Sequence, residues 1–201
     1  MAEDLDTDAA LMTRVREGDR AAFEQLVDRY QQPIMNFVAR MLRDETEAED
    51  VAQHTFVQVW KAAHRYEVSA RFSTWLFTIA RNLCLNEIRR RSRHAADSLD
   101  APISQDEDQP ARQLPDATSL MPSDLLTRGE LVQKVDEAIG DLPEAQRVAL
   151  LLCREEDVSY EEIGKVLGTS LSATKSLIFR ARETVKVRLK RYLTTGEWTE
   201  R

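Results

Sequence analysis

Apolar residues in the first part of the chain recur at steps of three and four positions between residues 23 and 42. This spacing places them on one face of an α-helix. The residues of this face are Phe23, Leu26, Val27, Tyr30, Ile34, Phe37, Val38 and Met41. Pro33 lies inside the pattern, and because a proline removes a backbone donor and clashes with the preceding turn, we expect it to bend or break the helix.

The same periodicity predicts two further helices. One follows an acidic cluster at 44–50 and has the apolar stripe Ala48, Val51, Ala52, Phe56, Val59 and Trp60. The other is expected to begin at Ser73 or Thr74, since either hydroxyl can cap it. Its inward residues are Trp75, Leu76, Ile79, Ala80 and Leu83, and it ends in the run Arg89-Arg90-Arg91. No alternating pattern long enough for a strand is present, so residues 11–94 predict one compact helical domain.

The periodic pattern disappears over residues 95–129, where prolines and acidic residues are frequent. A segment of low hydrophobicity and high net charge does not bury enough apolar surface to offset the entropy lost on ordering. This part of the chain is therefore interpreted as a flexible acidic linker.

Helical periodicity returns over residues 130–193. Its apolar positions are Leu131, Val132, Val135, Ala138, Ile139 and Leu142, then Val148, Ala149, Leu151 and Leu152. Pro143 stands where a first helical turn accepts a proline. Ser159 and Glu162 form a capping box, and a long basic helix is predicted from Leu171 to about Leu193. The predicted fold class is all-α, with two small helical domains joined by the linker.

Charge is distributed unevenly along the chain. The net charge is −7, which by itself argues against nucleic-acid binding. Basic residues nevertheless gather at 81–93 and at 175–191, and association is governed by local fields rather than by the total. The two basic segments therefore indicate DNA binding more strongly than the average charge argues against it.

Other classes of site find little support. Cys84 and Cys153 are far apart, and His54, His64 and His94 have no metal-binding spacing. We interpret both cysteines as buried small hydrophobic residues and expect no metal or cofactor.

The sequence has no stretch that is apolar for long enough to span a bilayer, and its first residues are acidic, unlike a secretion signal. A cytoplasmic protein without membrane insertion is expected.

The segment 159–182 has the pattern of a helix-turn-helix. Gly168 ends the first helix, where it can adopt a left-handed conformation without steric cost. The second helix would expose residues near its start, the part that enters a major groove in this motif. The candidate DNA-binding residues are Ser172, Lys175, Ser176, Phe179, Arg180 and Arg182. The alternative is a solvent-exposed basic helix in a helical bundle that does not bind DNA.

The second basic segment lies near a short aromatic loop. Arg81, Arg89 and Arg93 are spaced by multiples of four, which places them on roughly one side of a helix. The loop at 63–72 before them contains His64, Arg65, Tyr66, Arg71 and Phe72. Aromatic and basic side chains on a loop can hold unstacked bases against a positive surface, although aromatic loop residues more often fill a core.

Three segments of the chain carry a resemblance to a known family. The run from Asp44 to Trp60, DETEAEDVAQHTFVQVW, is similar to the polymerase-binding segment of bacterial RNA polymerase sigma factors of the sigma-70 family. The run 72–82, FSTWLFTIARN, continued by NEIRR at 86–90, resembles their promoter-melting helix. LPEAQR at 142–147, SYEEIG at 159–164, Lys175-Ser176 and RAR at 180–182 resemble their C-terminal helix-turn-helix. Two such domains on a short chain match the extracytoplasmic-function (ECF) group.

The resemblance implies a role for each segment. Asp50, Gln53, Phe56 and Trp60 would contact the clamp helices of core RNA polymerase, and the flap would be a further contact. The helix beginning at Leu171 would read the minus-thirty-five element of promoter DNA. The melted minus-ten element would be captured by His64, Arg65, Arg71, Asn82, Arg89 and Arg90. The acidic linker would thread the polymerase channel that later carries RNA.

The resemblance also implies a protein without catalytic residues that is monomeric within the holoenzyme. Control by an anti-sigma protein remains open.

The chain departs from the family pattern at three places, one of which is Ala173-Thr174, where a Thr-Val pair is common. His54 stands where the family often has an acid, and Leu177 stands where an arginine is frequent. The difference at His54 puts one polymerase contact in question. The differences in the helix-turn-helix imply either a different promoter sequence or the loss of one phosphate contact.

Two other hypotheses remain. A stand-alone DNA-binding regulator would explain the helix-turn-helix but not the segment 44–60. An enzyme would need a nucleophile with its base, a phosphate-binding loop or a metal cluster. Gly164 and Gly168 form no phosphate-binding loop, because no Gly-Lys-Ser/Thr follows them.

Overall fold

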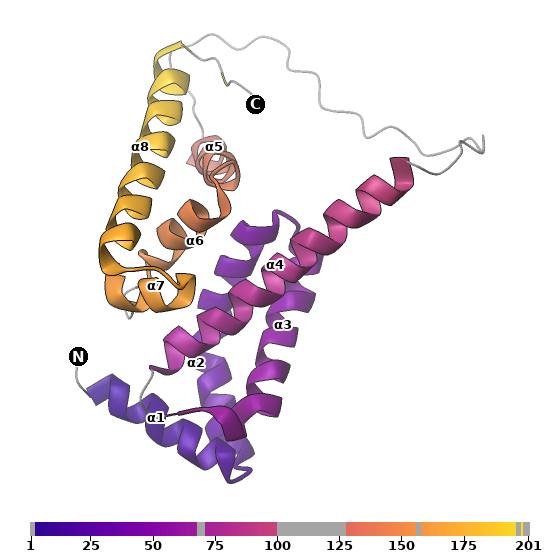
Figure 1. Cartoon of the computed structure of the whole chain (residues 1–201), viewed down its shortest axis with the longest axis vertical. Coiled ribbons are helices and arrows are strands. Elements are labelled where there is room, and N and C mark those ends of the chain that lie inside the picture. Colours follow the sequence, from indigo (N-terminus) through magenta and orange to yellow (C-terminus); the bar gives the residue numbers. More distant parts are fainter. Residues whose placement is uncertain (1–2, 68–70, 100–127, 156–157, 196–197, 199–201) are drawn as a thin grey trace.

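The computed structural model of the chain describes residues 3–67, 71–99, 128–155, 158–195 and 198. Its helices are α1 (Glu3–Arg16), α2 (Arg20–Leu42), α3 (Glu45–Ala62), the 3₁₀ turn η1 (Ala63–Arg65), α4 (Phe72–Leu99), α5 (Arg128–Gly140), α6 (Glu144–Leu152), α7 (Tyr160–Leu167) and α8 (Leu171–Thr195). No strand occurs among these residues. The expected all-α fold of two small helical domains is confirmed (Figure 1).

The segment between the two helical parts is shorter at both ends than the linker that the sequence predicts at 95–129. Helix α4 continues as far as Leu99, and α5 already begins at Arg128. The rest of the expected linker, residues 100–127, lies outside the described residues.

Helix α1 was not predicted from the sequence. Its apolar residues Leu11, Met12 and Val15 are buried, but they occupy only its second half, so the periodic signal is short. Asp8 is a buried carboxylate on this helix and accepts hydrogen bonds from the Tyr30 hydroxyl and the Arg29 guanidinium of α2. A buried carboxylate needs such partners to offset its lost hydration, so α1 is tied to α2 by polar as well as apolar contacts.

Helices α2 and α3 begin at aspartate caps. The Asp19 carboxylate accepts from the Ala22 backbone N–H, and the Asp44 carboxylate accepts from that of Glu47, which satisfies donors left free at a helix start. Helix α2 runs unbroken through Pro33. Of the two expected effects, a break at this proline is therefore wrong, while a bend stays a prediction.

Helix α4 begins at Phe72, and Ser73 and Thr74 are buried in its first turn. The prediction that one of these hydroxyls caps the helix is wrong. Phe72 is buried against the rings of Tyr30 and Tyr66, with centroid distances of 5.2 and 6.3 Å. Because the phenylalanine packs into the core at this point, the helix begins before the two polar residues.

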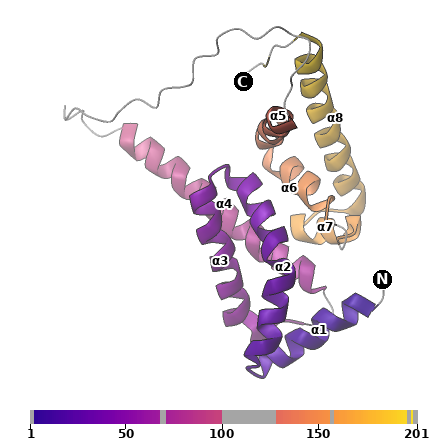
Figure 2. The ribbon, with the colours of Figure 1, turned by 180° about the vertical axis from the view of Figure 1, so that it is seen from behind.

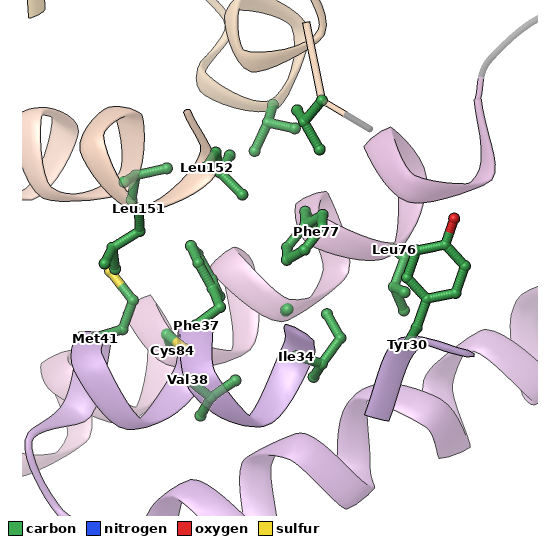
Figure 3. Packing of buried hydrophobic residues seen from close by; sticks show 14 of the residues in the cluster. Tyr30, Ile34, Phe37, Val38, Met41, Leu76, Phe77, Cys84, Leu151 and Leu152 are labelled. Atoms are coloured by element: carbon green, nitrogen blue, oxygen red, sulfur yellow. The ribbon is translucent and has the colours of Figure 1, made fainter. Parts of the chain in front are cut away.

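One apolar core extends through both parts of the chain. Helix α2 packs against α1, α3 and α4, and it also contacts α5 and α6. Figure 3 shows Phe37 and Met41 of α2 facing Leu151 and Leu152 of α6. Helix α4 crosses the molecule and lies against α7, as the opposite views in Figures 1 and 2 agree.

Phe77→Ala should lower the free energy of unfolding by about 3–5 kcal/mol, because it leaves a cavity in this core. Phe77 is 1% exposed, and its ring lies 5.5 Å from that of Phe37 in an edge-to-face arrangement. The matched control is Phe179→Ala, since Phe179 is 66% exposed. Urea unfolding followed by circular dichroism measures both variants, and equal losses at the two positions would contradict the core assignment.

Candidate nucleic-acid interface

Helix α7, the turn after it and the start of α8 form the predicted helix-turn-helix. The Ser159 Oγ accepts from the Glu162 N–H at 3.3 Å, and the Glu162 carboxylate accepts from the Ser159 N–H at 2.7 Å. Gly168 ends α7 with a φ of 68°. The capping box and the left-handed glycine cap are both confirmed.

The two helices of the motif approach each other closely at Gly164. A Cβ at this position would lie 2.9 Å from the Thr169 carbonyl oxygen and 3.1 Å from Thr174 Oγ1. Ile163 and Val166 of α7 are buried in the same core as Ile178 and Ala181 of α8, while Leu167 is partly buried against it. The sequence-based prediction of this shared core is confirmed.

Helix α8 presents all six predicted DNA-binding residues to solvent. Thr174, Ile178 and Ala181 are buried on its inner side. The exposed residues are Ser172, Lys175, Ser176, Phe179, Arg180 and Arg182. Their spacing of three and four positions places them on one side of the helix, where they form a continuous surface.

The six residues predicted for the minus-ten element do not form one pocket. His64 and Arg65 are exposed on η1, while Asn82 and Arg89 are exposed on α4. Asn82 and Arg89 share a helix face, but a rise of 1.5 Å per residue separates them by about 10 Å along the axis. The arrangement is an extended track rather than a cavity.

The other two minus-ten residues already have acidic partners. Arg90 donates hydrogen bonds to Glu87 from Nε, at 2.9 and 3.1 Å, and from Nη2, at 2.7 Å. The Nε of Arg71 lies 2.8 Å from the Glu162 carboxylate, which is only 7% exposed. Glu162 belongs to α7, so Arg71 faces the helix-turn-helix.

The aromatic residues in the loop and in the first turns of α4 divide into two groups. Tyr66 and Phe72 are buried at 4% and 2% exposure, so they fill the core, which decides between the two sequence interpretations. Trp75 is half-buried and lies seven residues before Asn82. That spacing places both on one face of α4, and it is the signal by which Trp75 could have been found as a candidate.

The predicted polymerase contacts lie along α3. Asp50 and Gln53 are exposed, Phe56 is partly buried, and Trp60 is 36% exposed with its ring 5.1 Å from that of Phe23. Sequence analysis did not select Val57, which is 46% exposed on the same helix. Val57 lies one helical turn from Trp60, so the two side chains place exposed apolar surface on the same part of α3.

Arg81 and Arg147 connect the two parts of the chain, and no signal in a single sequence identifies them. Arg81 donates to the Val166 carbonyl oxygen at 3.3 Å and to Glu144 at 3.1 Å. Arg147 donates to the Met41 carbonyl oxygen at 2.9 Å, and its burial lowers the pKa of its guanidinium. The sequence places Arg81 with Arg89 and Arg93 on one basic side of the helix. Because Arg81 is engaged with α6 and α7, it is not available on that side.

The cysteines differ in burial. Cys84 is fully buried, and burial raises the pKa of its thiol to about 12, so it is a neutral core residue. Cys153 is only partly buried, which corrects the expectation for this residue.

Among the described residues, no group of three or more His, Cys, Asp or Glu side chains is arranged to hold a metal ion. No helix in that part of the chain is long and apolar enough to cross a membrane.

Two family models match the two helical parts in order. Residues 26–94 match sigma-70 region 2, and residues 132–185 match sigma-70 region 4. The chain belongs to the sigma-70 family. As a sigma factor, it directs promoter-specific, DNA-templated transcription initiation.

Characterised sigma factors are similar over most of their length. The RNA polymerase sigma-H factor of Pseudomonas aeruginosa is 35% identical over 178 residues, 89% of this chain and 91% of the relative. The ECF sigma factor SigW of Bacillus subtilis is 31% identical, with 88% and 94% covered. The ECF sigma-E factor of Escherichia coli is 33% identical, with 92% and 95% covered. The predicted ECF group is confirmed.

Solved sigma-factor structures have the same fold. RpoE of Bartonella quintana in complex with the anti-sigma factor NepR is 27% identical with a TM-score of 0.64, over 84% of this chain and 96% of that one. CnrH in complex with the cytosolic domain of CnrY is 24% identical with a TM-score of 0.65, over 92% and 98%. The second likeness concerns the fold alone.

Gly168→Ala should lower the free energy of unfolding by about 1 kcal/mol, because an L-residue is strained in the left-handed region. No atom lies within 4 Å of the added methyl group, so backbone strain alone is tested. Gly129→Ala is the matched control. It also meets open space, but it lies in helix α5, where alanine is favoured over glycine by about 0.5–1 kcal/mol. Opposite signs in urea unfolding are expected, and a stabilising Gly168→Ala would disprove the cap.

Proposed function

We propose that this sigma factor binds core RNA polymerase through residues 11–94, captures the melted minus-ten element with the same part, and reads the minus-thirty-five element with residues 130–193. The observation that carries the proposal is the exposed surface of α8, where all six candidate residues lie on one side of a capped helix-turn-helix. Such a helix presents its first turns to base edges in the major groove.

The contact with the minus-thirty-five element combines base reading and phosphate binding. Ser172, Lys175, Ser176 and Phe179 are proposed to face the bases, and Arg180 and Arg182 the phosphates. Leu177, which replaces a frequent arginine, is partly buried. A leucine cannot donate to a phosphate, so we propose that this chain lacks that contact.

The contact with core polymerase is assigned to α3. Asp50 and Gln53 supply polar groups, while Phe56, Val57 and Trp60 supply apolar surface. His54 stands beside them, exposed and 2.8 Å from the Gln58 amide nitrogen. Acidic residues on this surface would meet basic residues of the clamp helices, since complementary charge steers association.

A second polymerase contact is proposed on α8. Leu150, Val185, Leu189 and Leu193 line an apolar groove. Its other lining residues are Arg182, Lys186, Lys190 and Thr194. An amphipathic helix binds such a groove through its apolar face, and the flap of the polymerase is the proposed occupant.

The minus-ten contact is assigned to the track formed by η1 and α4. His64, Arg65, Asn82 and Arg89 are accessible along it, and the half-buried Trp75 offers a ring on which an unstacked base can lie. Arg71 and Arg90 belong to the same proposed surface, but each must leave its acidic partner before it binds DNA.

Three expectations complete the proposal. The protein has no catalytic activity of its own, it acts in the cytoplasm with the polymerase, and it is monomeric within the holoenzyme. An anti-sigma protein is a further proposed partner, because RpoE of Bartonella quintana, 27% identical, is found with one.

The decisive experiment reconstitutes initiation. Purified core enzyme and the full chain are incubated with a library of random DNA placed upstream of a reporter, and the transcribed templates are selected and sequenced. Selected templates that share two elements with fixed spacing support the proposal. Transcripts that do not depend on the added chain would rule it out, and tight sequence-specific binding without polymerase would favour a stand-alone regulator.

Lys175→Ala should weaken binding of the holoenzyme to the selected promoter by roughly threefold to tenfold. It should also lower the slope of log affinity against log salt by about one, because one positive charge that releases counterions from the DNA is lost. Lys61→Ala, on α3 of the other domain, removes the same charge and is the control. An unchanged salt slope for Lys175→Ala would remove this residue from the DNA surface.

Asp50→Ala should weaken the affinity for core polymerase roughly threefold to tenfold, since an exposed charge contributes on the order of 1 kcal/mol. Asp28→Ala, at an exposed position of α2, removes an equal charge and is the control. Competition binding with a labelled chain measures both variants, and equal affinities would contradict the assignment of α3.

A further inference from the structure

A small polar pocket lies between the end of α1 and the turn η1, and its lining residues are Thr13, Arg16, Glu17 and His64. Its volume is about 280 Å³, which is close to the lower end of the range for small-molecule pockets and suits a ligand the size of one nucleobase. Helix α1 lies against η1 at this end of the molecule (Figures 1 and 2). Because His64 also belongs to the proposed minus-ten track, the pocket opens where that track ends.

The wall of the pocket that α1 provides is fixed by a defined turn. The inner side of α1 is buried in the core, and Gly18 has a φ of 90°, which lets the chain reverse directly after Glu17. The Asp19 carboxylate then accepts from the Ala22 N–H at 3.1 Å and from Arg14 Nε at 2.9 Å. Both contacts hold the pKa of Asp19 below its usual value. The position of Glu17 is therefore set by the fold and does not depend on a ligand.

The pocket carries an acid and a base that are not used elsewhere. Within the part of the chain that the structure describes, the side chains of Arg16, Glu17 and His64 have neither a hydrogen bond nor an ion pair. The Thr13 hydroxyl donates to the Ala9 carbonyl oxygen at 2.9 Å, so its oxygen is left as an acceptor. The pocket thus offers acceptors at Glu17 and Thr13, a donor group at Arg16 and a planar ring at His64.

The four DNA bases differ in how they match these groups. Guanine alone has two adjacent donors on its Watson–Crick edge, the N1–H and the 2-amino group, which fit the two oxygens of one carboxylate. Its O6 and N7 are acceptors that an arginine binds. Cytosine, adenine and thymine each have a single donor group on that edge, so one carboxylate oxygen would stay without a partner. A histidine ring provides a stacking surface for an unstacked base. The chemistry of the pocket therefore favours guanine.

We propose that α1 and η1 form a guanine-specific pocket for one unstacked base of the melted promoter strand, in which Glu17 accepts from the Watson–Crick edge and Arg16 donates to O6 and N7. The base adjoins the minus-ten element at the end of the track that His64 marks. In a duplex the same edge is occupied by pairing, so the pocket acts only on DNA that has been melted. This inference rests on the proposed minus-ten surface, and it makes Arg16 and Glu17 specificity-determining residues of promoter recognition.

The first test compares base preferences among the promoters selected from the random library. The unaltered holoenzyme should select guanine at one position next to the minus-ten element. With Glu17→Ala this preference should fall roughly fivefold to twentyfold, because one good base contact gives discrimination of this order. Preferences at other positions should not change. Glu24→Ala is the matched control, since it removes the same charge from an exposed position of α2 outside the pocket.

The second test removes one group from the base. Promoter DNA with a preformed mismatched bubble carries either guanine or hypoxanthine at the selected position, and hypoxanthine lacks only the 2-amino group. The unaltered holoenzyme should bind the guanine DNA roughly threefold to tenfold more tightly, whereas Glu17→Ala should bind both DNAs alike. Arg16→Ala should weaken binding to both and keep their ratio, because O6 and N7 are present in both bases. A purely structural role of α1 would change both affinities without changing the ratio in Glu17→Ala.

The outcomes separate this inference from the proposed function. Selected promoters without a guanine next to the minus-ten element would overturn the pocket, and so would a guanine preference that survives in Glu17→Ala, while promoter-dependent transcription stands. A different base whose selection is lost in Glu17→Ala would overturn the assignment to guanine. If the unaltered chain supports no promoter-dependent transcription, the proposed function fails and the inference fails with it. Thermal unfolding of each variant verifies that it is folded.

Discussion

The packing of α4 is the constraint on which the rest of this structure depends. One face of the helix closes the core with Phe77 and Cys84, and its first turn is held by Phe72 among the rings of Tyr30 and Tyr66. Because that side is occupied, the polar side with Asn82 and Arg89 must face outward. The same packing brings α4 against α7, so one helix positions a proposed DNA track and also receives the other domain.

In this protein the positions of the charged residues matter more than the net charge. Acidic residues of α3 are exposed where we propose a protein partner, and basic residues of α8 are exposed where we propose DNA. Between the domains, opposite charges are paired with each other, as in Arg43 with Asp141 and Arg71 with Glu162. Exposed ion pairs such as that of Arg43 with Asp141 are individually weak, whereas the carboxylate of Glu162 is buried.

The regular parts of the fold could be predicted because they depend on local spacing. Ser159, Glu162 and Gly168 form the predicted caps, since capping involves neighbouring residues alone. The prediction failed where packing overrides a local preference: α4 begins at Phe72 rather than at a capping hydroxyl, and α2 continues through Pro33. The exposed candidates on α8 followed from helical periodicity, whereas the acidic partners of Arg71 and Arg90 did not.

The sequence by itself determined the helical class, the order of the two domains, the helix-turn-helix and the family, because each depends on residues close together in the chain. The tertiary structure alone decided which aromatic residues fill the core, which arginines are already paired, and that the two domains share an apolar core. Those features depend on contacts between residues far apart in the sequence, and periodicity carries no information about them. Arg43 illustrates the difference: its left-handed backbone and its place against Gly140 become visible only when α2 and α5 are packed together.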